Sequence, residues 1–185
     1  MSVLVKICGL GREQDVDAAV AAGADLVGFV LVPSSPRAVT VERARELAAR
    51  VPAGVRTVAV VERANGALPG FDLVQAYERH GLPPQAILAT RGDPPEEPPE
   101  GMPILLDLPF GSRPGPADLR THWRRAAAVR APVVLAGSLT PDNVGEAVRA
   151  VRPWAVDTAR GVETAPGVKD ARLIQCFVAT ARESS

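Results

Sequence analysis

A cysteine stands at the end of the first apolar run of the chain. Lys6-Ile7-Cys8-Gly9 follows directly on Val3-Leu4-Val5, and a run of this kind that stops at a glycine is typical of a strand leaving a sheet. Parallel α/β proteins keep their chemistry at that edge of the sheet. Cys8 can act there as a base or nucleophile if a neighbouring charge or helix end lowers its pKa. The alternative is that Cys8 is a small buried hydrophobic residue.

A carboxylate occupies the corresponding place on a later apolar run. Asp107 follows Ile104-Leu105-Leu106, so we expect its side chain at the same edge of the sheet as Cys8. A thiol and a carboxyl across one barrel mouth make a base and an acid. An aspartate that ends a strand can instead cap a loop or the next helix.

Two glycine-containing loops follow the last two predicted strands. The first is Leu135-Ala136-Gly137-Ser138-Leu139-Thr140 and the second is Asp157-Thr158-Ala159-Arg160-Gly161-Val162. In barrels these loops commonly hold a phosphate on backbone N–H groups and helix N-termini. The alternative is that Gly137 and Gly161 only permit turns.

Other side chains that could do chemistry are more isolated. Arg37 lies in the loop after the second predicted strand, where its planar cation could hold a carboxylate, although a solvated loop arginine is the commoner case. His80 and His122 are read as surface or packing residues, and Cys176 as part of an apolar helix face in the core.

Short β-rich runs alternate along the chain with stretches of helical periodicity, which predicts βαβ units and a parallel sheet, hence the α/β class. Seven strands are expected, at 3–7, 26–32, 56–61, 86–90, 103–108, 133–136 and 155–158. Six helices are expected, near 12–22, 41–51, 71–80, 117–129, 141–150 and 170–182. Thr140, followed by Pro141 and Asp142, predicts the start of the fifth of these helices.

Residues 92–101 break this rhythm. Four prolines, three glutamates, an aspartate and two flanking glycines can form neither a helix nor a central strand, so the segment is predicted to be a linker. A (β/α)₈ barrel usually takes roughly 200 residues or more, and this chain has 185. We therefore expect a TIM-type barrel that lacks or remodels its fifth βα unit.

Composition narrows the function classes. The 185 residues, 46% of them hydrophobic, can bury one core, and no compositional shift divides residues 1–185 into two domains. The 21 basic and 21 acidic residues form no block of like charge, which argues against nucleic acid as the partner. Two cysteines with no metal-ligand spacing argue against zinc and for a reduced compartment. No run is apolar enough to span a bilayer and no signal segment is evident, so we expect a cytoplasmic protein with a small-molecule substrate.

Several of these segments together resemble one family. They are Val5-Lys6-Ile7-Cys8-Gly9, Ala22-Gly23-Ala24-Asp25 with Gly28-Phe29-Val30, Ser35-Pro36-Arg37, Ile104-Leu105-Leu106-Asp107, Leu135-Ala136-Gly137 with Pro141-Asp142-Asn143-Val144, and Ala155-Val156-Asp157 with Gly161-Val162-Glu163 and Pro166-Gly167-Val168-Lys169-Asp170. In this order they resemble phosphoribosylanthranilate isomerase, over the whole chain except its middle. That family consists of (β/α)₈ barrels that carry out an Amadori rearrangement in tryptophan biosynthesis without cofactor or metal.

The resemblance implies a role for each matching residue. Asp107 would be the acid that opens the furanose ring, and Cys8 the base that takes the C2′ proton. Arg37 would meet the anthranilate moiety and Asp157 the ribose hydroxyls. The backbones around Gly137, Ser138 and Gly161 would hold the phosphate. Arg160 lies where the family has a serine, and it would either compensate for lost phosphate contacts or block them.

The chain also departs from the family pattern. Leu88-Ala89-Thr90-Arg91-Gly92 stands where a Gln-Leu-His-Gly-like stretch is expected, and the glycine-rich loop after Asp107 is absent. One alternative is therefore a related enzyme acting on a different phosphosugar or aromatic amine conjugate. Another is a non-catalytic barrel that binds a ligand or partner and pairs with a second copy through a free sheet edge. A monomer and a homodimer both remain open.

Overall fold

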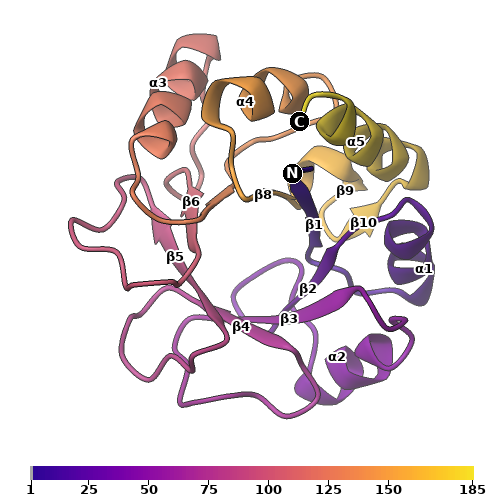
Figure 1. Ribbon diagram of the computed structural model, residues 1–185. Coiled ribbons are helices and arrows are strands. Elements are labelled where there is room, and N and C mark those ends of the chain that lie inside the picture. Colours follow the sequence, from indigo (N-terminus) through magenta and orange to yellow (C-terminus); the bar gives the residue numbers. More distant parts are fainter. Residues whose placement is uncertain (1) are drawn as a thin grey trace.

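A closed barrel of parallel strands forms the centre of the protein (Figure 1). The structure is a computed structural model and describes residues 2–185. Its barrel strands are β1 (Leu4–Cys8), β2 (Leu26–Val30), β3 (Arg56–Val61), β4 (Leu73–Ala76), β5 (Ala86–Arg91), β6 (Ile104–Asp107), β7 (Val133–Leu135) and β8 (Ala155–Thr158). Each strand pairs with the next, and β8 pairs with β1, so the predicted TIM-type barrel is confirmed.

Helices cover only part of the barrel wall (Figure 1). They are α1 (Glu13–Ala21), α2 (Val41–Ala48), α3 (Pro116–Ala127), α4 (Val144–Val151) and α5 (Ala171–Glu183), with a 3₁₀ turn η1 (Arg160–Val162) and a small hairpin of β9 (Glu163–Ala165) and β10 (Val168–Lys169) before α5. Within residues 2–185, the connections after β3, β4 and β5 contain no helix. We call β3, β4 and β5 with these connections the loop-backed side, and the remainder of the barrel with its five helices the helix-backed side.

The expected number of strands was wrong. Residues 71–80 were predicted as a helix, but Leu73–Ala76 is the barrel strand β4, paired with β3 and β5. The register Val60↔Gln75↔Ile87 supplies hydrogen bonds on both edges, which a helix at this place could not give to its neighbours. The run 86–90 is therefore the fifth strand and 103–108 the sixth.

The proline-rich linker takes the place of one helix and not of a whole βα unit. Residues 92–101 connect β5 to β6, and these strands pair directly, in the register Arg91↔Asp107. The fifth βα unit thus keeps its strand and lacks its helix. Because the barrel closes, the argument for a free sheet edge, on which the pairing of two copies rested, was wrong.

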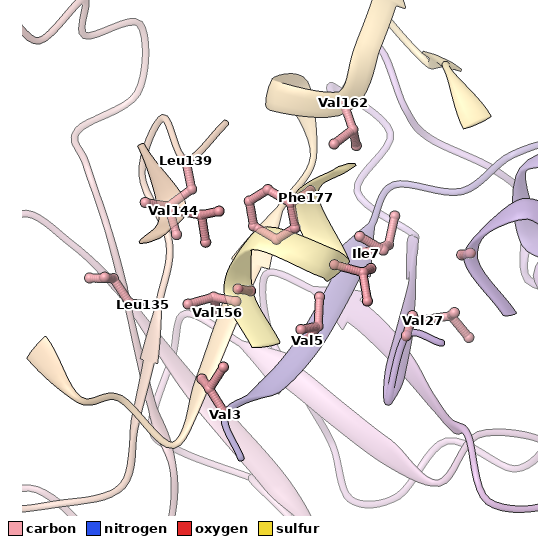
Figure 2. Packing of buried hydrophobic residues seen from close by; sticks show 14 of the residues in the cluster. Val3, Val5, Ile7, Val27, Leu135, Leu139, Val144, Val156, Val162 and Phe177 are labelled. Carbon is pink, nitrogen blue, oxygen red and sulfur yellow. The ribbon is translucent and has the colours of Figure 1, made fainter. Parts of the chain in front are cut away.

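Two cores follow from the period-two alternation of the strands. Outward side chains such as Val5, Ile7 and Val156 pack against the helices, where Phe177 of α5 is fully buried (Figure 2). Inward side chains fill the barrel with Cys8, Leu26, Val58, Val60, Ile87, Ala89, Leu105, Val134, Ala136 and Ala155. On the loop-backed side the connections supply their own small cluster, in which Val74 and Ala76 pack with Ala64.

Candidate active site

The barrel interior ends, at the carboxyl ends of the strands, in a ring of polar side chains. Cys8 and Leu105 belong to the interior cluster, so Lys6, two residues before Cys8, and Asp107, two residues after Leu105, face inward as well. The same alternation from Ala155 turns Asp157 inward. The structure therefore brings Cys8 and Asp107 to one mouth, as the strand ends predict.

A fully buried lysine lies below the thiol. Lys6 Nζ donates to Asp157 Oδ1 at 2.8 Å, between residues paired in the register of β1 and β8. Burial alone would lower the pKa of Lys6, but the Asp157 carboxylate and neighbouring Cys8 raise it above its ordinary value. Lys6 therefore keeps its positive charge beside the thiol. This role was not predicted from the sequence, although Lys6 lies two residues before Cys8 and so on the same face of β1.

Asp157 has a second function in the structure beyond the one its family position implies. Its Oδ1 is taken by Lys6, and within residues 2–185 its Oδ2 receives no hydrogen bond. That oxygen remains available for a ligand hydroxyl, so the interpretation of Asp157 as a ribose contact stays a prediction.

Cys8 lies against the backbone of the neighbouring strand. A Cβ at Gly28 of β2 would lie 2.8 Å from Cys8 Sγ and 3.3 Å from Lys6 Nζ, so the glycine makes room for both groups. Burial raises the pKa of the Cys8 thiol, while the Lys6 ammonium opposes that rise. Cys8 is a buried residue, yet one that adjoins a fixed cation able to stabilise its thiolate.

Asp107 is a carboxyl group with an unusual affinity for its proton. Its pKa is raised to about 6, mainly by burial; the N–H of Leu108, which donates to Oδ1 at 2.8 Å, opposes this, and Asp157 adds to it. The bond to Leu108 shows that Asp107 also caps the loop after β6. The two interpretations of this residue are compatible, because Oδ2 is free of partners among residues 2–185 and a protonated carboxyl can donate from it.

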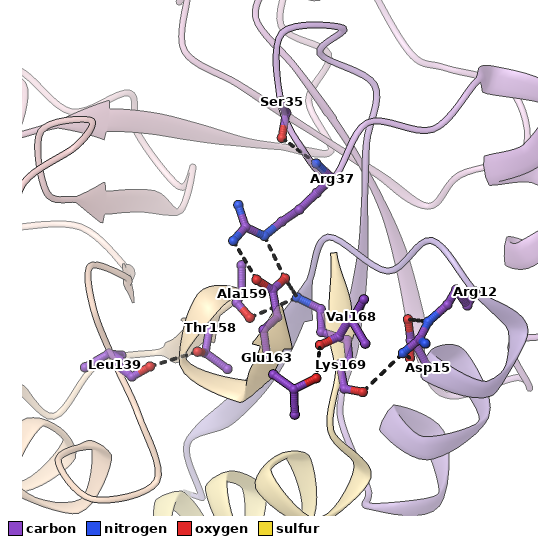
Figure 3. A network of polar contacts seen from close by, with 11 residues as sticks. Arg12, Asp15, Ser35, Arg37, Leu139, Thr158, Ala159, Glu163, Val168 and Lys169 are labelled. Carbon is purple, nitrogen blue, oxygen red and sulfur yellow. Dashed lines mark hydrogen bonds and ion pairs between the residues drawn. The ribbon is translucent and has the colours of Figure 1, made fainter. Parts of the chain in front are cut away.

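Arg37 is held in place by a carboxylate that the sequence reading did not assign. Its Nε and Nη2 donate to Glu163 at 2.7 and 2.6 Å, and Lys169 Nζ donates to the same carboxylate at 2.7 Å (Figure 3). Burial would raise the pKa of Glu163, but Arg37 and Lys169 hold it below its ordinary value. A Cβ at Gly9, whose φ is +73°, would lie 2.6 Å from Arg37 Cδ, so this glycine lets the arginine cross the end of β1.

The hairpin of β9 and β10 explains why Glu163 and Lys169 are in contact. It places Glu163 opposite Lys169, six residues later. Glu163 and Lys169 stood in the motifs that resemble the family, but their contact depends on the pairing of two very short strands, which sequence patterns do not reveal.

The loops after β7 and β8 pack together at one side of the mouth. Gly137 and Ser138 have positive φ, of +92° and +56°, and within residues 2–185 their N–H groups donate to no acceptor. Arg160 Nη2 donates to Ser138 Oγ at 3.0 Å. Gly161 abuts Leu139 so closely that a side chain there would collide with its carbonyl oxygen. Backbone N–H groups, a hydroxyl and a guanidinium thus gather where an anion was predicted.

The helix after this first loop begins later than predicted. Thr140 was expected to cap it, but α4 starts at Val144 with Asn143 as the N-cap residue. Asn143 Oδ1 accepts from the N–H of Thr140 at 2.8 Å, and Nδ2 donates to the carbonyl of Ser138 at 3.0 Å. Asn143 therefore closes a turn that fixes the shape of the glycine loop.

The remaining candidates lie elsewhere. His122 is buried and its Nε2 bonds the carbonyl of Ala136 at 3.0 Å, a packing role as expected. His80 is exposed. Cys176 was expected in the core but is exposed, because the buried face of α5 runs through Ile174, Phe177 and Val178 instead.

Two residues of the loop-backed side also reach the mouth and were missed. Arg91, at the end of β5, places its guanidinium carbon 3.9 Å from the centroid of the Tyr77 ring, which follows β4.

Within residues 2–185, no group of three or more His, Cys, Asp or Glu side chains is placed to hold a metal ion, and no helix could cross a membrane.

Comparison with known proteins agrees with the barrel. The family model described as N-(5'phosphoribosyl)anthranilate (PRA) isomerase matches residues 106–180. The N-(5'-phosphoribosyl)anthranilate isomerase of Thiobacillus denitrificans is 40% identical over 206 residues, covering 100% of both chains. A crystal structure of phosphoribosyl anthranilate isomerase in complex with reduced 1-(o-carboxyphenylamino)-1-deoxyribulose 5-phosphate has a TM-score of 0.74 and 28% identity, covering 98% of this chain and 99% of that one.

A second solved structure concerns assembly. The structure described as mutually generated monomers of dimeric phosphoribosylanthranilate isomerase from Thermotoga maritima has a TM-score of 0.71 and 30% identity to this chain, covering 97% of it and 98% of that chain. Together with the full-length relative, the shared barrel and the predicted motifs, these likenesses identify the chain as a member of the phosphoribosylanthranilate isomerase family.

Proposed function

We propose that this protein catalyses the reaction for which its family is named, the Amadori rearrangement of N-(5′-phosphoribosyl)anthranilate to 1-(2-carboxyphenylamino)-1-deoxyribulose 5-phosphate. The observation that carries the proposal is the placement of Cys8 and Asp107 on one barrel mouth, beside loops after β7 and β8 where Arg160 donates to Ser138. No cofactor enters the reaction, because it moves protons and one C–O bond within a single molecule.

Ring opening needs an acid, and Asp107 is suited to supply it. The protonated carboxyl gives its proton to the furanose ring oxygen while the C1′–O bond breaks. The nitrogen lone pair forms the new C1′=N bond, which leaves an open-chain Schiff-base cation. A pKa raised to about 6 by burial keeps a usable fraction of Asp107 protonated near neutral pH.

Proton removal from C2′ needs a base, and Cys8 is suited to that step. The thiolate takes the C2′ proton, the C–H electron pair forms the C1′=C2′ bond, and the C=N electron pair returns to nitrogen. The resulting enolamine tautomerises to the ketone. Because burial disfavours the thiolate, the buried Lys6 ammonium has to stabilise it, and Asp157 fixes Lys6 in that position.

The remaining site residues would hold the substrate. The phosphate fits the loops of Gly137, Ser138 and Gly161, with Arg160 as its cation. Asp157 Oδ2 is free to accept from a ribose hydroxyl. Arg37, clamped by Glu163, would present its remaining nitrogen, Nη1, toward the anthranilate moiety.

The test is the steady-state loss of fluorescence of enzymatically generated phosphoribosylanthranilate. Turnover by the unaltered protein that both Cys8→Ala and Asp107→Ala reduce by about 10²- to 10⁴-fold would support the reaction and both roles. The controls are Cys176→Ala and Asp93→Ala, which remove the same groups from exposed positions. A Cys8→Ala variant as active as its control would refute the role of the thiol.

A changed substrate is the second candidate, and the loop-backed side favours it. In the part of the chain that the structure describes, no helix follows β3, β4 or β5, and Tyr77 and Arg91 lie at that part of the mouth. A folded protein that ignores phosphoribosylanthranilate but turns over another phosphosugar or aromatic amine conjugate would establish this alternative. A protein inactive on the whole panel would be a binding barrel.

We also propose a cytoplasmic location, in keeping with the reduced cysteines, and either a monomer or a homodimer. Sedimentation at micromolar concentration separates the two states.

A further inference from the structure

The buried histidine of α3 reaches the backbone at the end of a barrel strand. His122 was expected to pack, and it is 3% exposed, but its Nε2 also bonds the carbonyl of Ala136 at 3.0 Å. Ala136 directly follows β7 and directly precedes Gly137, where the loop with the predicted phosphate contacts leaves the barrel. His122 therefore holds the peptide from which that loop starts.

The imidazole is the donor in this hydrogen bond. A carbonyl oxygen only accepts, so Nε2 of His122 carries the proton. Burial lowers the pKa of His122 below its ordinary value, although the bond to Ala136 opposes this effect. The ring is therefore neutral at neutral pH, with its proton on the nitrogen that faces the carbonyl.

The same bond sets the direction of the next N–H group. The peptide between Ala136 and Gly137 is trans, so its carbonyl and its N–H point in opposite directions. The carbonyl of Ala136 is turned toward α3, which lies outside the barrel wall (Figure 1). The N–H of Gly137 is therefore turned away from α3, to the side of the mouth, and within residues 2–185 it donates to no acceptor.

Gly137 also lies against the loop that carries the proposed acid. A Cβ at Gly137 would lie 3.2 Å from His122 Nε2, 3.1 Å from the backbone nitrogen of Leu108 and 2.9 Å from Leu108 Cγ. That nitrogen donates to Asp107 Oδ1 at 2.8 Å. The absence of a side chain at Gly137 thus lets the histidine approach the carbonyl and keeps the two loops in contact.

We propose that His122 is a positioning residue for phosphate binding, which holds the Ala136 carbonyl and so aims the Gly137 N–H at the phosphate of the substrate. This inference rests on the proposed function, which assigns the phosphate to the loops after β7 and β8. His122 itself lies behind the peptide and does not touch the phosphate. An N–H that is already aimed costs less to order when the anion binds, so the effect falls on binding and not on the proton transfers at Cys8 and Asp107.

The experiment compares ligands with and without a phosphate in His122→Phe, which keeps a buried ring and removes the donor. The ligands are reduced 1-(o-carboxyphenylamino)-1-deoxyribulose 5-phosphate and its dephosphorylated form, and calorimetry gives their Kd. We expect Kd to rise about 5- to 20-fold for the phosphorylated ligand and less than about twofold for the other, because only the first uses the aimed N–H. Equal weakening of both ligands, or of neither, would overturn the inference. His80→Phe is the matched control, since His80 is exposed.

His122→Gln tests the donor itself. The amide nitrogen of a glutamine can take the place of the imidazole Nε2, so this variant should recover most of the phosphate preference that His122→Phe loses. In turnover of phosphoribosylanthranilate by His122→Phe, KM should rise as Kd does, with kcat changed less than about threefold. A glutamine variant as weak as the phenylalanine variant, or a fall in kcat at unchanged KM, would contradict the role.

A measurement on the unaltered protein does not depend on the folding of a variant. Inorganic phosphate is titrated into ¹⁵N-labelled protein while NMR follows the amide of Gly137 and the Nε2–H of His122. We expect both resonances to shift with one Kd, because the peptide joins the two groups. A shift at Gly137 without one at His122, or no shift at either, would refute the inference.

The titration also separates this inference from the isomerase activity. Coupled shifts in a protein without turnover would support the role of His122 and contradict the proposed reaction. Turnover in a protein without coupled shifts would leave the proposed reaction standing and refute the role of His122.

Discussion

The two sides of the barrel differ in how their outward side chains and ion pairs are buried. On the helix-backed side the outward residues of the strands pack against α1 to α5, and the ion pairs of Lys6 with Asp157 and of Glu163 with Lys169 are buried. On the loop-backed side Val74 and Ala76 of β4 pack outward against Ala64 in a cluster of three buried residues, and the pair Arg63–Glu78 is exposed.

This difference in burial bears on how firmly side chains at the mouth are held. The proposed base, acid and phosphate loops belong to strands that helices support, where side chains can be held to the precision that catalysis needs. The loop-backed side contributes Tyr77 and Arg91 to the mouth.

The largest stability effect is expected at the buried ion pair. Lys6→Met leaves the Asp157 carboxylate buried without its partner, and we expect the free energy of unfolding to fall by about 3–5 kcal/mol. Urea denaturation measures it. The double variant Lys6→Met/Asp157→Leu should lose clearly less, since it removes both charges. If the single and double variants are equally unstable, packing of the Lys6 stem and not its charge is what matters.

The packing outside the barrel on the two sides can be compared by making the same change, valine to alanine, on each side. Val156 of β8 and Val74 of β4 both point outward and are at most 2% exposed. Val156→Ala should cost about 2–3 kcal/mol, because helices hold the cavity open, and Val74→Ala about 1 kcal/mol, because the surrounding loop can collapse onto it. Denaturant unfolding of the two variants tests the difference. Equal losses would mean that the loops pack as rigidly as the helices.

Asp107 should destabilise the folded protein in exchange for its function. Its pKa of about 6 exceeds that of an unfolded aspartate, so the folded state binds more protons between about pH 4 and 6. Stability therefore falls as the pH rises through this window. Asp107→Asn, whose amide oxygen can still accept from Leu108, should gain on the order of 2 kcal/mol at pH 8 and nothing below about pH 4. Urea denaturation at pH 4, 6 and 8 tests this, with Asp93→Asn as control. A pH-independent difference would show that ionisation of Asp107 is not its cause.

The sequence predicts much of the fold because short apolar runs mark seven of the eight strands. It missed β4 because Leu73–Ala76 is short and lies among helix-forming residues, and its pairing with β3 and β5 outweighs that local preference. Because of this miss, the run 86–90 was counted as the fourth strand, so the family's Gln-Leu-His-Gly-like stretch was sought after what is the fifth strand.

The candidate site divides in the same way. Cys8 and Asp107 could be placed from the sequence because each ends a recognisable strand. The pairs Lys6–Asp157 and Arg37–Glu163 could not, because they join residues 151 and 126 positions apart, and such contacts follow from barrel closure and from the β9–β10 hairpin. The inward position of Arg91 could have been predicted from the sequence, since Ile87, Ala89 and Arg91 share one face of β5.

The smallest effect is expected at the exposed ion pair of the loop-backed side. Arg63 Nε lies 2.6 Å from Glu78 Oε1, but the two side chains are 76% and 45% exposed, so water screens the attraction and ordering two long side chains offsets it. Arg63→Ala should change the free energy of unfolding by less than about 1 kcal/mol and leave kcat/KM unchanged. Thermal unfolding at low and at high salt measures the first quantity, and salt should abolish the small difference that remains. Because Glu78 directly follows Tyr77, a large loss of stability or of kcat/KM would show that this surface pair orders the end of β4. The loop-backed side would then owe its order to exposed charges and not to its small apolar cluster.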